Sequence, residues 1–320
     1  MKWKENSIHV AISFDENYIT PFYVLLTSLF VNNRDNNIVI HAIATGVNED
    51  QKSEIVDFVL DHKSQIYFYE LDVNNLNGLV IPKGTWFSIA AYYRLFFPSL
   101  VGEDVQKLLY VDADTVIIRD LSELYFQDLG DKPVGAVREK LGYARPEIGN
   151  TDRENYFNSG VMLINVPEWR KQQVTERALQ FVHDFPDAIQ CVDQDALNAV
   201  LINNWLRIHA KYNVLYQDIP MNLGKRSYPA YLRDKVIIHF TLGEHKPWRA
   251  LGENRFRYLY HEYLRQSPRK GEKKYQDFRM SAPFLLKYSR VRATEFVRNY
   301  PKMLILLSTI KHIAAALIEL

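Results

Sequence analysis

The sequence has a single cysteine, no long apolar run and almost no net charge, and each shortage excludes a class of protein. Cys191 alone cannot form an intramolecular disulfide, which excludes the disulfide scaffolds of small secreted domains and fits a reducing compartment. The longest uninterrupted apolar run is residues 313–318, far too short for a membrane-spanning helix. Residues 1–6 are polar and lead directly into an apolar segment, so we expect no cleaved export signal.

The composition indicates a globular core with a distinct C-terminal part. The chain has 320 residues, of which 47% are hydrophobic and 13% aromatic, enough for a large buried core. Its formal net charge is +1, yet residues 265–302 carry eleven Lys or Arg against three acidic residues, which leaves the remainder net negative. This asymmetry predicts a domain over residues 1–264 and a basic C-terminal extension over 265–320.

Apolar periodicity predicts an α/β fold. Strand-like and helix-like segments alternate in the first seventy residues, which implies parallel strands joined by right-handed crossovers in a doubly wound layer. The predicted strands are 8–13, 38–44, 65–71, 107–111, 133–137, 161–166 and 236–240. The predicted helices are 17–32, 49–60, 88–98, 167–184 and 193–201. Polar residues 140–155 predict a mobile loop over the sheet edge.

Two aspartates follow the predicted strand 107–111 and are the most informative residues of the chain. Because side chains alternate along an extended backbone, Asp112 and Asp114 are expected on the same side. Open α/β sheets bind ligands at the carboxyl ends of their strands, which is where this pair lies. Two carboxylates suit a divalent cation that also holds phosphate oxygens, although a solvated turn explains these two residues equally well.

Three other positions each have a structural explanation beside a functional one. Asp15 either caps the helix that follows it or faces a ligand at the same sheet edge. Arg94 is either a surface arginine or a partner for phosphate or for an aspartate of the site. Gly160 either makes a turn or lets the backbone approach a ligand closely.

Polar residues in the second half of the chain likewise have a structural and a functional explanation. Asp193 and Gln194 either place a charge at a helix N-terminus or form a site for sugar hydroxyls. His239 ends an apolar strand and is either a buried core histidine or a ligand. A lysine seven positions later, beyond a glycine turn, brings a phosphate partner within reach.

Six segments resemble, in order, the motifs of glycosyltransferase family 8, a group of retaining enzymes that includes bacterial lipopolysaccharide galactosyl- and glucosyltransferases. The segments are HVAISFDENY (9–18), SIAAYYRL (88–95), LLYVDADT (108–115), FNSGVMLIN (157–165), DQDAL (193–197) and HFTLGEHKPW (239–248). The resemblance covers about residues 7–250. It implies a GT-A fold, that is, a Rossmann-like mixed sheet flanked by helices, with UDP-glucose or UDP-galactose as donor and Mn²⁺ or Mg²⁺ as cofactor.

The resemblance also implies roles for individual residues. The metal ligands would be Asp112, Asp114 and His239. The uracil and ribose would be held by Asp15, Asn17 and Tyr18, and the diphosphate by Lys246 and the Gly243 backbone. The donor sugar would be bound by Arg94, Asn158, Asp193 and Gln194, the last two as the catalytic pair, and Ala113 also belongs to the donor-binding residues. The family usually has a small polar residue about three positions before this arginine, and Ala91 stands there instead, so the resemblance does not carry over one sugar contact.

The function implied is a metal-dependent retaining hexosyltransferase that adds glucose or galactose to a cell-surface glycan or glycolipid. Retention requires either a carboxylate nucleophile or same-face attack, and the Gln194 amide is a poor nucleophile, so we expect same-face attack. Two alternatives stay open: a nucleotide-sugar-binding protein without turnover, and a glycogenin-like primer that glycosylates one of its own tyrosines. Residues 140–155 and 212–231 are expected to shape the acceptor cleft.

The C-terminal residues predict the cellular location. Residues 303–320 have the pattern of an amphipathic helix, and they follow the basic stretch. Together these features predict a cytoplasmic protein attached peripherally to the anionic inner face of the cytoplasmic membrane. A helix packed on the catalytic domain or on a dimer partner is the alternative. No nucleic acid is expected as a partner, because the basic stretch has no accompanying recognition motif.

Overall fold

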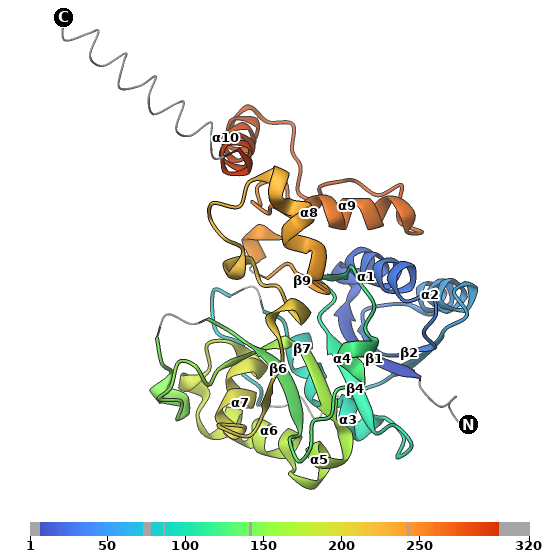
Figure 1. The fold of residues 1–320 in the computed structure, drawn as a ribbon, viewed down its shortest axis with the longest axis vertical. Coiled ribbons are helices and arrows are strands. Elements are labelled where there is room, and N and C mark those ends of the chain that lie inside the picture. The colour runs from blue at the N-terminus through green and yellow to red at the C-terminus, as the bar shows by residue number, and fades with distance from the viewer. Residues whose placement is uncertain (1–6, 73–77, 86, 141–142, 242, 301–320) are drawn as a thin grey trace, which may run out of the picture.

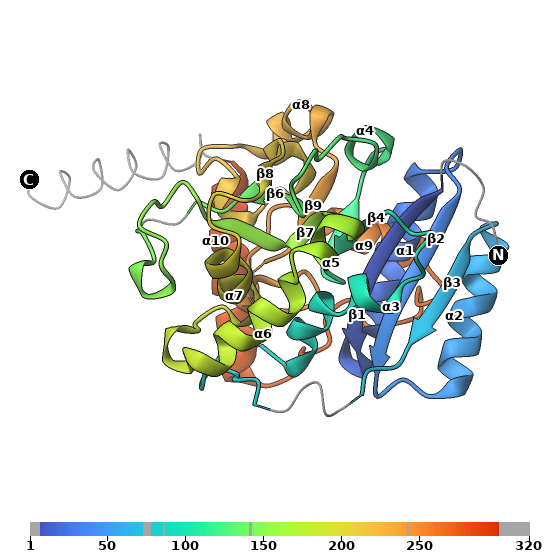
Figure 2. The same ribbon diagram turned by 90° about the horizontal axis from the view of Figure 1, so that it is seen from below.

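The protein is built around a mixed seven-stranded sheet (Figures 1 and 2). The structure is a computed structural model, and it describes residues 7–72, 78–85, 87–140, 143–241 and 243–300. The strand order is β3-β2-β1-β4-β7-β6-β8. β7 runs antiparallel to β4 and β6, whereas the other paired strands are parallel. The strands are β1 (Ile8–Asp15), β2 (Ile38–Thr45), β3 (Gln65–Tyr69), β4 (Lys107–Val111), β6 (Val134–Arg138), β7 (Phe157–Asn165) and β8 (Leu206–Arg207).

The central strands are buried on both faces of this sheet. In β1, Val10 and Ile12 pack into a core formed with α1 (Ile19–Asn32) and α2 (Glu49–Asp61). Ala11, which points the other way, joins a second core that also contains Trp169 and Leu197. The alternation of side chains along each strand therefore supplies two apolar layers, as a sheet covered by helices requires. The helices of the second layer are α3 (Phe97–Leu100), α5 (Val166–Lys171), α6 (Val174–Asp184) and α7 (Val192–Val200).

A two-stranded sheet forms a further layer above α1. It pairs β5 (Thr115–Ile117) with β9 (Ile237–His239) in antiparallel register, so that Thr115 lies opposite His239. Beneath it is a third apolar cluster that includes Val24 of α1 and Tyr260 of α9 (Arg257–Gln266). α1 is consequently buried along most of its length, between the main sheet and α9 (Figure 1).

The structure corrects several predicted elements. The parallel arrangement predicted for the first seventy residues is confirmed in β1, β2 and β3, and the reversed β7 makes the whole sheet mixed, as the family resemblance implied. The strand predicted at 161–166 begins at Phe157, which places Asn158 and Gly160 inside it. The helix predicted over 167–184 is two helices, because Gln173 adopts a left-handed φ of 51°. The helix predicted over 88–98 is a 3₁₀ turn followed by α3, with Pro98 in the first turn of α3, where no amide hydrogen is required.

The C-terminal extension contains α10 (Ala282–Asn299), which lies beside α8 (Tyr228–Tyr231) at one end of the molecule (Figure 1). Arg292 donates to the Ala250 carbonyl at 3.2 Å, and Glu295 pairs with Arg257 at 3.0 Å. The predicted helix over 303–320 lies outside the described residues. Among the residues that are described, no helix is long and apolar enough to cross a bilayer.

Candidate active site

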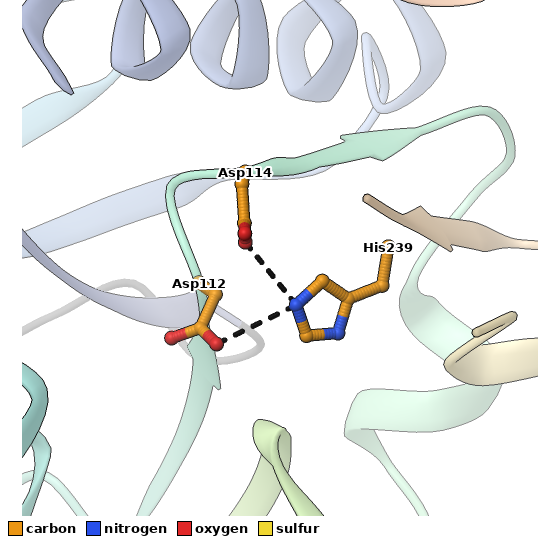
Figure 3. A group of neighbouring side chains, drawn as sticks. All are labelled: Asp112, Asp114 and His239. Atoms are coloured by element: carbon orange, nitrogen blue, oxygen red, sulfur yellow. Dashed lines mark ion pairs between the residues drawn. The ribbon is translucent and has the colours of Figure 1, made fainter. Parts of the chain in front are cut away.

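Three side chains that could ligate a metal, Asp112, Asp114 and His239, converge where β4 leaves the main sheet and the chain turns into β5 (Figure 3). The Nε2 atom of His239 lies 3.1 Å from Oδ1 of Asp114 and 3.5 Å from Oδ2 of Asp112. The two aspartates meet because the chain turns after Val111, rather than through alternation along a strand. The pairing of β5 with β9 then places the histidine opposite Thr115 and thus next to Asp114.

The residues of this cluster fit a divalent cation. Oδ1 of Asp114 is buried and accepts no hydrogen bond; it faces Nε2 of His239, another candidate ligand, so both atoms are available to a cation between them. Gly160 provides the space, since a Cβ there would lie 2.5 Å from Oδ2 of Asp112 and would overlap the His239 ring. Two carboxylates and one imidazole match the preferences of Mn²⁺ better than those of a softer metal. Only one such group of three potential ligands occurs within the described part of the chain.

Lys246 places a positive charge beside Asp112, Asp114 and His239. Its Nζ forms an ion pair with Oδ2 of Asp114 and donates to the Phe240 carbonyl at 2.8 Å. Burial alone would raise the pKa of Asp114, but Lys246 and His239 outweigh it and hold that pKa well below the usual value. The lysine is itself buried, on the loop that follows β9 and contains Gly243. A cation therefore lies within reach of any phosphate that the metal would hold.

The residues predicted to hold the nucleoside lie at the same edge of the sheet. Asp15 ends β1, and its side chain accepts a hydrogen bond from the backbone N–H of Asn17 at 2.9 Å, so it caps the short turn that follows. Tyr18 packs edge-on against Trp248, with ring centroids 5.6 Å apart. Burial raises the pKa of Tyr18, and the positive charge of the nearby Lys246 opposes part of that rise. The ring therefore lies close to Lys246. Asp15 and Asn17 are solvent-accessible. Capping leaves the second carboxylate oxygen of Asp15 for a ligand.

Arg94 bridges the metal-site aspartate and the helix that carries the predicted catalytic pair. Its guanidinium pairs with Oδ1 of Asp112 and with Oδ2 of Asp193, both at 3.0 Å. It also donates to the carbonyl and hydroxyl oxygens of Ser159 and stacks over the Tyr110 ring, whose hydroxyl donates to Asp112 at 2.8 Å. Arg94 is thus a buried bridge between aspartates rather than a surface side chain.

The predicted catalytic pair lies in the first turn of α7, and both side chains are held by neighbours. Burial raises the pKa of Asp193 to about 7, although Arg94 and the Ser159 hydroxyl pull it the other way. The Gln194 amide has four partners. Its Nε2 donates to Glu139 at 2.9 Å and to the Tyr156 hydroxyl at 3.1 Å. Its Oε1 accepts from Asn158 Nδ2 and from the Ser159 backbone N–H, both at 3.1 Å. The amide is therefore oriented before any sugar binds.

The third residue of this turn of α7, Asp195, has a structural role. It is fully buried and accepts hydrogen bonds from Arg145 Nη1 at 2.8 Å, from the Tyr156 hydroxyl at 2.6 Å and from two backbone N–H groups. Arg145 belongs to the segment 140–155 that was predicted as a mobile loop, and it is only 2% exposed. The prediction is wrong at this point, because an ion pair ties the segment to α7.

Sequence reasoning missed the residues that orient the predicted ones. Glu139 accepts from both Asn158 Nδ2 and Gln194 Nε2, and Tyr156 joins Gln194 to Asp195. Asn213 accepts from the His239 ring, although it lies at the start of the segment assigned to the acceptor cleft. These contacts join residues far apart in sequence, and the polar character of Glu139 and Asn213 is the only signal in the sequence that could have pointed to them.

Comparison with known proteins is consistent with this geometry. The family model of glycosyl transferase family 8 matches residues 9–252. General stress protein A of Bacillus subtilis (strain 168) is 31% identical over 272 residues, which cover 82% of this chain and 94% of that protein. The lipopolysaccharide 1,2-glucosyltransferase of Escherichia coli (strain K12) is 29% identical over 249 residues, 75% of this chain and 72% of that one.

Among solved structures, the galactosyltransferase LgtC in complex with donor and acceptor sugar analogs has the same fold. It superposes with a TM-score of 0.70 at 22% identity, covering 88% of this chain and all of LgtC. The mixed sheet with its flanking helices is therefore the GT-A fold that the sequence motifs implied. With the match of the family model over most of its length, the chain belongs to glycosyl transferase family 8.

Proposed function

We propose that this enzyme transfers glucose or galactose from a UDP-sugar, with retention of anomeric configuration, in a reaction that depends on Mn²⁺ or Mg²⁺. The observation that carries the proposal is the convergence of Asp112, Asp114 and His239 beside Lys246, at the edge of the sheet where Asp15 and Tyr18 also lie. A nucleotide diphosphate needs this combination of a cation site and a further positive charge.

The chemistry follows from where charge develops. Departure of UDP places negative charge on the diphosphate, and a divalent cation held by the three ligands would stabilise that charge. Lys246, which pairs with Asp114, supplies a second positive charge next to the cation site. The departing phosphate then needs no strong general acid. Arg94 pairs with both Asp112 and Asp193 and thereby fixes the positions of the two carboxyl groups.

The positions of the carboxylates favour same-face attack over double displacement. Asp193 is paired with Arg94, and Asp195 is paired with Arg145, so neither is presented as a free nucleophile. The four hydrogen bonds of Gln194 suit a group that positions the sugar. The acceptor hydroxyl would then be steered and deprotonated by the departing phosphate on the face it leaves. A glycosyl adduct trapped on Asp193 would overturn this mechanism.

The acceptor we propose is a cell-surface glycan or glycolipid. Support comes from the relatives named as lipopolysaccharide glucosyl- and galactosyltransferases.

We further propose that the C-terminal extension attaches the enzyme to the anionic inner face of the cytoplasmic membrane. On and next to α10, the apolar Met280, Leu286 and Phe296 are exposed near the exposed Lys287 and Arg290. Exposed apolar groups among cations match an anionic bilayer surface. The test is binding to lipid vesicles. We expect the protein to bind phosphatidylglycerol vesicles but not phosphatidylcholine vesicles, and the double variant Leu286→Ser/Phe296→Ser to lose this binding.

The enzymatic proposal is tested by incubating the full chain with UDP-glucose, UDP-galactose or UDP-N-acetylglucosamine, with Mn²⁺ or with a chelator. We expect metal-dependent release of UDP from one of the two hexose donors, and NMR should show the α-anomer as the first sugar released. Release of the β-anomer would contradict retention. An increase in intact mass would instead identify self-glycosylation, and tight UDP binding without turnover in the presence of cell-envelope glycolipids would identify a binding protein.

A further inference from the structure

We propose that Asn213 is a positioning residue that joins the metal site to the sugar site, by fixing the His239 ring and the Asn158 amide at the same time. The proposal rests on the proposed function, since it concerns the metal and donor that the site would hold. It adds a residue that neither the sequence motifs nor the family match identifies.

Asn213 lies at the centre of the site without facing solvent. It follows the 3₁₀ turn Ala210–Tyr212 and is fully buried. The next residue, Val214, bonds through its backbone to both Ile237 and His239, at 2.9 and 3.0 Å. These bonds hold the segment alongside β9 and align the Asn213 side chain with the histidine.

Two hydrogen bonds connect this side chain to the two sites. Oδ1 of Asn213 lies 3.0 Å from Nδ1 of His239. Nδ2 of Asn213 lies 2.8 Å from Oδ1 of Asn158. The asparagine therefore spans the space between the imidazole of the metal cluster and the amide predicted to contact the donor sugar.

The direction of these bonds follows from a group that cannot flip. The backbone N–H of Gly160 can only donate, and it donates to Oδ1 of Asn158 at 3.1 Å. This fixes the Asn158 amide, so the atom of Asn213 that faces the same oxygen must be the Nδ2 donor. The Oδ1 atom of Asn213 then faces His239, whose Nδ1 must carry the proton.

The consequence is a defined state of the metal ligand. With the proton on Nδ1, the Nε2 atom presents its lone pair toward Asp112 and Asp114, as metal ligation requires. Partners of this kind orient ligating histidines, and losing one costs about 10- to 100-fold in metal affinity. A single residue here serves both the metal ligand and a residue of the sugar site.

Two substitutions separate the two halves of this role. Asn213→Ala removes both hydrogen bonds, and we expect Mn²⁺ affinity to fall by about 10- to 100-fold. Asn213→Asp keeps an oxygen that accepts the hydrogen bond from His239. It replaces the Nδ2 donor with a second oxygen, which would face Oδ1 of Asn158 and repel it. For this variant we expect Mn²⁺ affinity within about threefold of wild type, since the acceptor is kept. Affinity for the UDP-hexose should fall by about tenfold or more relative to UDP, through the displaced amide.

The test measures Mn²⁺ binding by electron paramagnetic resonance of the free ion, and UDP and UDP-hexose binding by calorimetry, on full chains whose fold is checked by circular dichroism. Asn33→Ala is the matched control, because Asn33 is also a buried, hydrogen-bonded asparagine but lies at the far end of α1. Its Mn²⁺ affinity should equal that of wild type.

The outcomes distinguish this proposal from the proposed function. If wild type binds no Mn²⁺, the proposed function fails. If wild type binds Mn²⁺ and Asn213→Ala binds it equally well, Asn213 is only structural and this proposal is wrong. Should the alanine variant unfold, Asn213→Asp decides alone. Loss of metal affinity as large as expected for alanine, or unchanged UDP-hexose affinity, overturns the proposal.

Discussion

The Cα atom of Gly160 faces the His239 ring so closely that a Cβ on it would overlap the imidazole and lie 2.5 Å from Oδ2 of Asp112. The sequence predicts that this glycine makes a turn or lets a ligand approach closely. In the structure, the missing Cβ leaves room for two of the three candidate metal ligands, so a substitution at position 160 tests the site sensitively.

Gly160→Ala should therefore weaken metal binding without unfolding the protein. The methyl group would push His239 and Asp112 apart, and we expect Mn²⁺ affinity to fall by about tenfold or more, as for loss of an orienting contact. Gly271→Ala is the matched control, because no atom lies within 4 Å of the Cβ it would add. Calorimetric titration with Mn²⁺ checks this, and equal affinities for the two variants would contradict the placement of the metal site.

Lys246→Met should lower turnover more than metal binding. The lysine pairs with Asp114 and is placed to stabilise the departing diphosphate, so we expect UDP release to fall by about 10²- to 10³-fold. Mn²⁺ affinity should be kept or increased, since Asp114 loses a competing cation. The measurement is steady-state UDP release, compared with that of Lys235→Met. Lys235 forms an ion pair with its neighbour Asp234 and lies over the Tyr231 ring, with no described contact to the cluster. Parallel losses in both variants would argue against the role.

Arg145→Met should destabilise the fold. The substitution leaves the fully buried Asp195 without its ion-pair partner, and breaking one side of a buried pair costs about 3 kcal/mol or more. Arg153→Met, which alters an exposed arginine 4.0 Å from Glu154, should change the free energy of unfolding by less than about 0.5 kcal/mol. Urea denaturation of both variants measures the difference, and similar values for the two would mean that Arg145 does not hold the segment.

Stability should decrease as the pH falls below about 6.5, well above the range in which ordinary carboxylates titrate. Burial lowers the pKa of His9 to about 4 and that of His41 to about 3, and the rings bond to each other at 2.9 Å. Below pH 6.5 the unfolded chain binds protons at these imidazoles and the folded chain does not, so the free energy of unfolding rises with pH. His261, whose pKa burial also lowers to about 3, adds to the same trend.

We expect a loss of about 2 kcal/mol between pH 7.5 and pH 5.5, measured by urea denaturation. His41→Gln should reduce this dependence, because one of the contributing imidazoles is removed. Asp193, whose pKa is raised to about 7, contributes in the opposite direction, so the expected loss is the net of the two effects. A pH dependence in His41→Gln equal to that of wild type would contradict the contribution of this ring.

The sequence predicted the sheet and the gathering of polar residues at one of its edges, because both depend on local patterns. The apolar strand before Asp112 and the capping position of Asp15 can be read from neighbouring residues. The contact between His239 and Asp114 depends on the pairing of β5 with β9, and three-residue strands carry too little periodicity to reveal it. The left-handed break at Gln173 likewise has no glycine to mark it.

The residues that orient the site were beyond sequence reasoning for a related reason. Asn213, Glu139 and Tyr156 act through hydrogen bonds to residues 19 or more positions away, and no helical or strand spacing relates such pairs. The sequence offered contact with an aspartate as one of two explanations for Arg94. The structure shows that it spans two aspartates, which requires the tertiary fold.

Sugar transfer by this enzyme is expected to depend on a metal held by Asp114. The most direct measurement compares UDP release from UDP-glucose and UDP-galactose by wild type, Asp114→Asn and the exposed control Asp61→Asn, with Mn²⁺ and with a chelator. We predict metal-dependent release by wild type and Asp61→Asn, and at least about a hundredfold slower release by Asp114→Asn with weakened Mn²⁺ binding. Release by Asp114→Asn at the wild-type rate, or release by wild type that the chelator does not affect, would contradict the account.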